Sequence, residues 1–266
     1  MGEPTRQARP SPSTLPYDIV EMIITHLTYN LCTLKACSLT CRSWYTAAVP
    51  CLHHTLTLRK DTHSAARSKL KPLPRLHKLG LMPLVKEIRV DQSWGRCVWF
   101  VPREFTRCNL RYFSALANVR TLEVENMEIY RFMPGIERYF KHLSPTLRSI
   151  TLHNPHCTPR QLSHFLSFFS NLDNIRISEP IAHTPNTTTP DTELTPLSAP
   201  KLRGLLQLYR FSWAETWTQL TASCGGLRFR RMDLCKVQNC APLLLEACTG
   251  TLEALRVSER EGVLGG

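Results

Sequence analysis

A short pattern of apolar and polar positions recurs through the C-terminal two thirds of the chain. In each copy an aliphatic residue is followed, after a gap, by two apolar residues that flank one polar residue, as in Val85…Ile88-Arg89-Val90. Because successive side chains of a strand point to opposite faces, this spacing predicts a strand with one buried face. The first residues of the flanking pairs recur 23 to 34 positions apart: Ile88, Leu122, Ile150, Ile175, Leu206, Met232 and Leu255.

Helical patterns lie between these predicted strands. The clearest begins with Thr158 as N-cap and Pro159 as the first helical residue. Apolar residues then follow at helical spacing: Leu162, Phe165, Leu166, Phe169 and Leu172. Further helices are expected around 112–118, 214–224 and 241–248. Strands that alternate with helices at this rhythm predict a parallel sheet with right-handed crossovers.

The first fifty residues have a different pattern. Residues 1–14 are rich in Pro, Ser and Arg and are predicted to be a disordered arm. A first helix is expected to begin at Pro16, with Leu15 as its N-cap. Its aliphatic residues fall on two adjoining stripes of the helix: Ile19, Val20, Ile23, Ile24 and Leu27.

Two further short helices complete this segment. The second is expected to have Thr33 as its N-cap, and the third to follow Thr40 and stop at Pro50. A unit of three such short helices is too small to bury its own apolar surface. It must therefore pack on the rest of the chain, on a partner, or on both.

The segments LPYDIVEMIITHL and TLKACSLTCRSW closely resemble the F-box, in the form found in large fungal F-box sets, and the resemblance covers residues 15–58. It implies a trihelical module that binds a Skp-type adaptor, which joins the module to a cullin scaffold. Asn30 departs from the family, whose members often carry an acidic residue there. Leu15 supports a partner contact, because an aliphatic residue caps a helix poorly. The implied adaptor-binding residues are Leu15, Pro16, Ile19, Val20, Ile23, Leu34, Leu39, Cys41 and Trp44.

The recurring strand pattern resembles degenerate leucine-rich repeats. The implied fold class is α/β, with an N-terminal three-helix F-box and an irregular leucine-rich-repeat-like solenoid with a parallel sheet. In this interpretation 59–83 is a basic connector, 84–266 binds a target protein, and 178–200 is a mobile Pro-rich insertion. The pattern departs from the repeat family at Asn126 and Asn154, which sit two places after the last aliphatic, not three.

The residue between the flanking apolar residues is polar in every copy and points away from the buried face. Strands lying side by side would align these residues as a strip across the open face of the sheet. We interpret the strip as a target-binding surface; the alternative is a face that is only solvated. The residues are Arg89, Glu123, Thr151, Arg176, Gln207, Asp233 and Arg256.

Charge and cysteine content refine this picture. The formal net charge is +12, and residues 59–111 hold 13 Lys and Arg against 4 Asp and Glu. This basic stretch, with Trp94 and Trp99 nearby, leaves nucleic-acid binding as an alternative function. The 11 cysteines are irregularly spaced, which favours free thiols in a reducing compartment. Because no signal-peptide or membrane-spanning pattern occurs, we expect a cytoplasmic or nuclear protein.

Motifs for catalysis are absent from the sequence. It contains no Cys-x-x-Cys pair, no phosphate-binding glycine loop and no G-x-S-x-G elbow. We therefore expect no metal, no cofactor and no enzymatic activity. The predicted function is that of a non-catalytic substrate receptor in a Skp-cullin-F-box type ubiquitin ligase. An F-box protein that acts without ubiquitin transfer remains an alternative.

Overall fold

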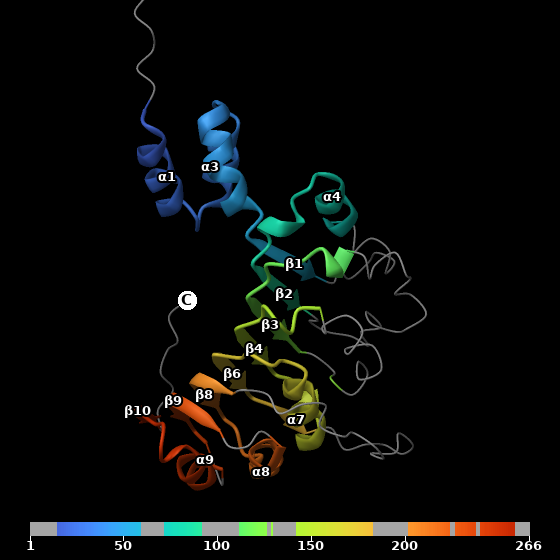
Figure 1. Ribbon diagram of the computed structural model, residues 1–266, viewed down its shortest axis with the longest axis vertical. Coiled ribbons are helices and arrows are strands. Elements are labelled where there is room, and N and C mark those ends of the chain that lie inside the picture. The colour runs from blue at the N-terminus through green and yellow to red at the C-terminus, as the bar shows by residue number, and fades with distance from the viewer. Residues whose placement is uncertain are drawn as a thin grey trace, which may run out of the picture. The chain divides into compact units, whose positions relative to one another are not determined.

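The computed structural model describes residues 15–59, 72–91, 112–126, 129, 142–182, 202–223, 227–237 and 240–258. It divides into two compact units, Met1–His54 and Thr55–Gly266, coloured from blue to red along the chain in Figure 1. We call them the helical unit and the sheet unit. The predicted disordered arm at 1–14 lies outside the described residues.

The helical unit contains three helices, as the sequence predicts: α1 (Tyr17–His26), α2 (Leu31–Ser38) and α3 (Arg42–Leu52). Its buried core is small and comprises Val20, Ile24, Leu34, Ala47 and Ala48. Leu27, Cys37, Trp44, Cys51 and Leu52 are partly buried around this core. The apolar contacts within the unit therefore come from only a few side chains of each helix.

The predicted helix ends in this unit were wrong in three places. Pro16 is the N-cap of α1, so Leu15 lies outside the helix. The N-cap of α2 is Asn30, whose side chain accepts a hydrogen bond of 3.0 Å from the Thr33 backbone N–H. Asn is a favourable N-cap, which gives a physical reason for the residue that departs from the family pattern.

The third helix continues through Pro50 to Leu52. Proline lacks a backbone N–H, so it removes one hydrogen bond of the last turn. The helix end is retained by later donors, because the His53 N–H bonds to the Val49 carbonyl at 3.1 Å. The sequence prediction placed the end of this helix at Pro50, but the helix continues for two residues beyond the proline.

The sheet unit is built on eight parallel strands that lie side by side in chain order. Seven of them are the strands that the recurring sequence pattern predicted, and their pairing confirms the predicted parallel sheet. The strand that the sequence prediction missed is β1, at the outer edge. The strands are β1 (Thr55–Arg59), β2 (Glu87–Asp91), β3 (Thr121–Glu125), β4 (Ser149–His153), β6 (Asn174–Ser178), β8 (Arg203–Tyr209), β9 (Arg228–Cys235) and β10 (Ala254–Ser258).

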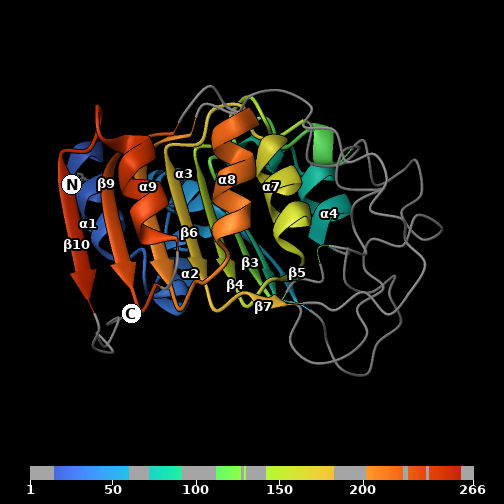
Figure 2. The ribbon, with the colours of Figure 1, turned by 90° about the horizontal axis from the view of Figure 1, so that it is seen from below.

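Helices cover one face of this sheet, as Figure 2 shows. They are α4 (Pro72–Lys78), α7 (Pro159–Ser167), α8 (Ala214–Ser223) and α9 (Ala241–Cys248), and the short 3-10 helix η2 spans Met82–Leu84. Thr158 is the N-cap of α7, as predicted, and forms a reciprocal capping box with Gln161. In the predicted 112–118 helix, only 112–114 are helical among the described residues.

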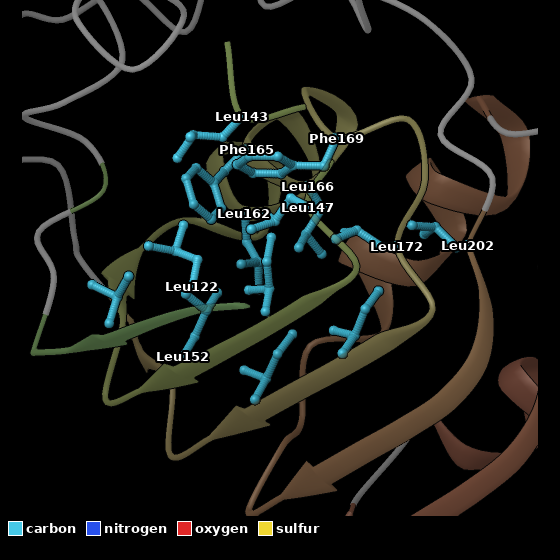
Figure 3. Close-up of a cluster of buried hydrophobic side chains, with 14 of the residues drawn as sticks. Leu122, Leu143, Leu147, Leu152, Leu162, Phe165, Leu166, Phe169, Leu172 and Leu202 are labelled. Carbon is cyan, nitrogen blue, oxygen red and sulfur yellow. The ribbon is translucent and has the colours of Figure 1, made fainter. Parts of the chain in front are cut away.

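Between the helices and the sheet lies one large apolar core, part of which is drawn in Figure 3. Phe165 and Leu166 of α7 point toward Leu122 and Leu152 of the strands, and all four side chains are buried. Phe169 and Leu172, which were predicted to continue the helix, lie beyond its end but are buried in the same core. The helix prediction was therefore too long, while its core residues were correct.

Two predicted boundaries differ from the structure. Within the predicted basic connector at 59–83, Leu73 and Met82 are buried in the core of the sheet unit, so 72–83 belongs to that unit. Within the predicted insertion at 178–200, Ile181–Ala182 forms β7, which pairs in parallel with β5 (His156–Cys157). The residues of both segments at 60–71 and 183–200 lie outside the described residues.

A residue with positive φ directly follows five of the strands. Its backbone N–H donates a hydrogen bond of 2.8–3.0 Å to the carbonyl of the last residue of the next strand, so the turns continue the ladder. Asn tolerates this left-handed conformation better than most residues, which explains the unusual placement of Asn126 and Asn154. The residues, with φ between 49° and 55°, are Asn126, Asn154, Glu179, Arg210 and Lys236.

Gly204 marks an irregularity between β8 and β9, where the pairing skips Arg230. Its φ is +86°, and the next residue, Leu205, donates a 2.8 Å hydrogen bond to the Asp173 carbonyl. A Cβ atom on Gly204 would overlap that carbonyl oxygen, whereas Gly80, with φ +68°, has open space around it. Substituting Gly80 by alanine therefore measures the free-energy cost of the positive φ alone, whereas substituting Gly204 adds the cost of the overlap with Asp173.

We expect Gly204→Ala to lower the free energy of unfolding by about 3 kcal/mol or more, because it adds overlap to an unfavourable φ. Gly80→Ala should cost only about 1–2 kcal/mol, from the conformation alone. Urea unfolding of both variants, followed by far-ultraviolet circular dichroism, measures the difference. Equal losses would show that Asp173 moves away and that the close approach is not a constraint.

Candidate functional site

The helical unit exposes many large apolar side chains for its size. Eight of them in the described residues 15–54 are more than a third exposed, against five buried core residues. Water-exposed apolar side chains at this density are typical of a surface that a partner covers. We call them the apolar set: Leu15, Tyr17, Ile19, Met22, Tyr29, Leu31, Leu39 and Tyr45.

The nine residues predicted to bind an adaptor fall into three classes. Leu15, Pro16, Ile19, Leu39 and Cys41 are exposed, with Leu39 at 86%. Ile23 and Trp44 are half-buried. Val20 and Leu34 are only 1% and 0% exposed and lie in the core of the unit. For these two the structure corrects the prediction, because a side chain without exposed surface stabilises the unit rather than contacts a partner.

Sequence reasoning missed five members of the apolar set: Tyr17, Met22, Tyr29, Leu31 and Tyr45. A signal for Met22 was present, since Ile19, Met22 and Ile23 are spaced i, i+3 and i+4 and share one stripe of α1. The core residues Val20 and Ile24 form the neighbouring stripe. The other four residues lie near helix ends, where periodicity gives no guidance.

Cys41 is exposed at the N-cap of α3, with its sulfur 3.1 Å from the Ser43 hydroxyl oxygen. The pKa of the Cys41 thiol is lowered from its ordinary value near 9.0, first by the Ser43 hydroxyl and then by the Trp44 backbone N–H. By contrast, burial raises the pKa of Cys157 and Cys248, and it raises the pKa of Cys240 to about 11. Among these four thiols, only Cys41 is both exposed and shifted toward the thiolate, which is the reactive form.

The second candidate surface is the face of the eight-stranded sheet opposite the helices, which we call the open face. The polar strip predicted from the sequence exists there as a structural feature. Each of its residues is the register partner of the next, from Arg89 opposite Glu123 to Asp233 opposite Arg256. Thr57 of β1 extends the strip by one strand, because it pairs with Arg89.

Polar contacts connect the strands at the β1 end of the open face. The Thr55 hydroxyl donates a 2.9 Å hydrogen bond to Glu87, and the Arg89 Nε donates a 2.8 Å hydrogen bond to the other oxygen of that carboxylate. The same Arg89 Nε lies 3.1 Å from Glu123. The hydrogen bond to Glu87 raises the pKa of Arg89 above its ordinary value, so its charge is fixed at any physiological pH.

The chain of contacts continues across the next two strands. The Nε2 atom of His153 lies 3.7 Å from the Glu123 carboxylate, and its Nδ1 lies 2.8 Å from the Ser178 hydroxyl oxygen. Toward the other end of the strip, Gln207 donates a 3.5 Å hydrogen bond to Asp233. Side chains on the open face are thus held by their neighbours on adjacent strands, which favours a preformed surface.

Charge is unevenly distributed over this face. Among the described side chains on β2 and β3, the carboxylates of Glu87, Glu123 and Glu125 accompany the single guanidinium of Arg89. Toward β10 the balance reverses, and Asp233 accompanies the guanidinium groups of Arg176, Arg231 and Arg256. The open face is therefore acidic toward one end and basic toward the other, which gives a bound molecule a preferred direction.

Two other kinds of site are absent from the described residues. These residues contain no group of three or more His, Cys, Asp or Glu side chains placed to hold a metal ion. No helix within the described ranges has the length and apolar content needed to cross a membrane.

Comparison with known families identifies the N-terminal segment. Residues 12–59 match the F-box-like family, so an F-box-like domain occupies this part of the chain. The matched segment contains α1, α2, α3 and β1. No curated protein matches the chain. The F-box part of the sequence prediction is thus supported, while the resemblance to leucine-rich repeats stays a prediction.

Cys41 offers a chemical probe of the helical unit. We expect iodoacetamide to modify Cys41 in the folded protein at neutral pH, while Cys157, Cys240 and Cys248 stay unmodified because they are buried. Ser43→Ala should shift the pH dependence of Cys41 alkylation to higher pH, because the lost hydrogen bond lets the pKa rise. Mass spectrometry of the labelled peptide measures both effects. An unchanged pH profile in Ser43→Ala would contradict the role of the hydroxyl.

Proposed function

We propose that the protein is a non-catalytic substrate receptor of a Skp-cullin-F-box type ubiquitin ligase. The observation that carries the proposal is the F-box-like match at 12–59, together with the apolar set exposed on the same segment. F-box domains generally bind Skp-type adaptors, and through them a cullin scaffold. A receptor of this kind contributes proximity, because it holds a target beside the enzyme that transfers ubiquitin.

The adaptor contact would bury apolar surface that the helical unit leaves exposed to water. Only five side chains form its buried core, whereas Leu15, Met22, Leu31 and Leu39 are at least half exposed. Covering those side chains removes apolar surface from water, with a gain of roughly 25 cal/mol for each Å² buried. An adaptor groove of complementary apolar character would therefore both bind and stabilise the unit.

The target-binding role is proposed for the open face of the sheet unit. Its polar strip runs across seven strands in register, and neighbouring side chains are positioned by hydrogen bonds and ion pairs. A preformed face loses less conformational entropy on binding than a mobile loop would. The acidic and basic ends favour a target with the opposite charge order along the same direction.

The adaptor contact can be tested with exposed residues that the fold does not need. We expect Leu15→Asp combined with Leu39→Asp to weaken binding to a purified Skp-type adaptor by about 100-fold, since exposed anchors of this size dominate such interfaces. Leu79→Asp, a matched change at a leucine that is 57% exposed in the sheet unit, should leave binding intact. Biolayer interferometry gives the affinities, and circular dichroism reports folding.

Outcomes of this experiment separate the proposal from its alternatives. If the double variant is folded and binds as tightly as the wild type, the apolar set is not the adaptor contact. Recovery of the adaptor without a cullin in a co-purification would support a protein that acts without ubiquitin transfer. Leu34→Ala serves as the folding control, because removing a fully buried leucine should cost about 2–5 kcal/mol.

The strip is tested by reversing one of its charges. We expect Arg176→Glu to reduce recovery of the co-purified target by roughly tenfold, because a charge pair with the target becomes a repulsion. Arg160→Glu, the same change on the helix-covered side, should leave recovery unchanged, and adaptor binding should persist in both variants. Quantitative mass spectrometry measures the recovery. Equal losses in the two variants would mean that net charge, rather than the strip, governs binding.

A further inference from the structure

The last strand of the sheet, β10, has an uncovered apolar side. Among the described strands it is an outer one, and it pairs with β9. Leu255 and Val257 occupy the positions that point toward the helices in the other strands, and they are 45% and 65% exposed. Their register partners on β9, Met232 and Leu234, are only 2% and 1% exposed. The helix side of the sheet is therefore buried at β9 but exposed at β10.

The opposite outer strand shows that this exposure is not a general property of sheet edges. On β1 the equivalent residues Leu56 and Leu58 are 4% and 1% exposed. They belong to the same core as Leu73 of α4 and Met82 of η2. Beyond β10 the described residues provide no corresponding helix. Among the described residues, one edge of the sheet is therefore covered and the other carries exposed aliphatic side chains.

The other face of β10 is basic. Arg256 projects from its open face, opposite Asp233 in register, and is exposed. Arg231 of β9 also lies on the open face and is exposed. An approaching strand would meet positive charge on this face and aliphatic side chains on the other.

We propose that β10 accepts an extended segment of a partner protein as a ninth strand. A further strand can pair with the outer edge of a sheet, so an extended segment is the kind of partner that fits β10. The segment alternates aliphatic residues, which pack on Leu255 and Val257, with acidic residues, which face Arg256. The inference does not depend on the ligase role, although Arg256 belongs both to this edge and to the strip.

A second copy of the chain fits this edge poorly. A two-fold axis makes the two β10 strands antiparallel, and full pairing of the five-residue strand places Arg256 directly opposite its own copy. Like charges directly opposite one another destabilise such a pair. Shifting the register by two residues separates the charges but leaves fewer residues paired. An acidic partner segment meets neither difficulty.

Fluorescence anisotropy with the full chain tests the proposal. The probe is a fluorescein-labelled octapeptide of alternating valine and glutamate, and the comparison peptide alternates valine and lysine. We expect the wild type to bind the glutamate peptide and not the lysine peptide. Val257→Lys should weaken binding at least tenfold, and Arg256→Glu should reverse the preference. Leu79→Lys, at an exposed leucine outside the edge, should bind as the wild type does.

Three results would overturn the proposal. The wild type could bind neither peptide. Val257→Lys could bind the glutamate peptide as well as the wild type, which would place the peptide on the open face instead. Sedimentation could show a wild-type dimer that Val257→Lys dissociates, which would make a second copy the occupant. Loss of target recovery in Arg176→Glu has no bearing on these outcomes, so the two tests remain separate.

Discussion

The in-register parallel pairing of the strands is the constraint on which both the core and the open face depend. Side chains alternate between the two faces of a strand, so one register places all the flanking apolar residues on the helix side and all the middle polar residues on the other. A shift by a single residue at any strand would expose its apolar pair and bury its polar middle residue. The hydrophobic core therefore fixes the polar strip: Ile88 and Val90 can be buried only if Arg89 faces outward.

The turns after the strands maintain this register at the cost of some backbone strain. Each positive-φ residue extends the ladder by one hydrogen bond, which ties the end of one strand to the end of the next. Asn126 and Asn154 reinforce the tie with a 3.2 Å hydrogen bond between their side chains, and Arg210 pairs with Glu179 at 2.7 Å. These side-chain contacts help offset a conformation that most residues other than glycine adopt unfavourably.

The alternation of apolar and polar residues predicted the strands and their faces well, because every second residue of a strand with one buried face must be apolar. The same pattern is present in Leu56-Thr57-Leu58, yet this copy was missed because it fell inside the segment that resembles the F-box. The helix ends were harder, since Asn30, Thr33 and Thr40 are all acceptable caps and only tertiary packing selects among them. Val20 and Leu34 could not be separated from Ile19 and Leu39 by sequence, because both pairs are aliphatic and only the fold decides which are buried.

The two outer strands show that packing of other side chains on a strand, rather than the sequence of the strand, decides whether its aliphatic residues are buried. The two strands share one sequence pattern: Leu56-Thr57-Leu58 in β1 and Leu255-Arg256-Val257 in β10. Both pair in parallel and in register with the neighbouring strand. The difference lies in the covering of each strand, since Leu73 and Met82 join the core beside β1 while Leu255 and Val257 stay exposed. An outer strand can pair with a further strand, and β10 also carries an apolar side. Its middle residue is an arginine where β1 has a threonine, so the open edge also carries the charge that would select its occupant.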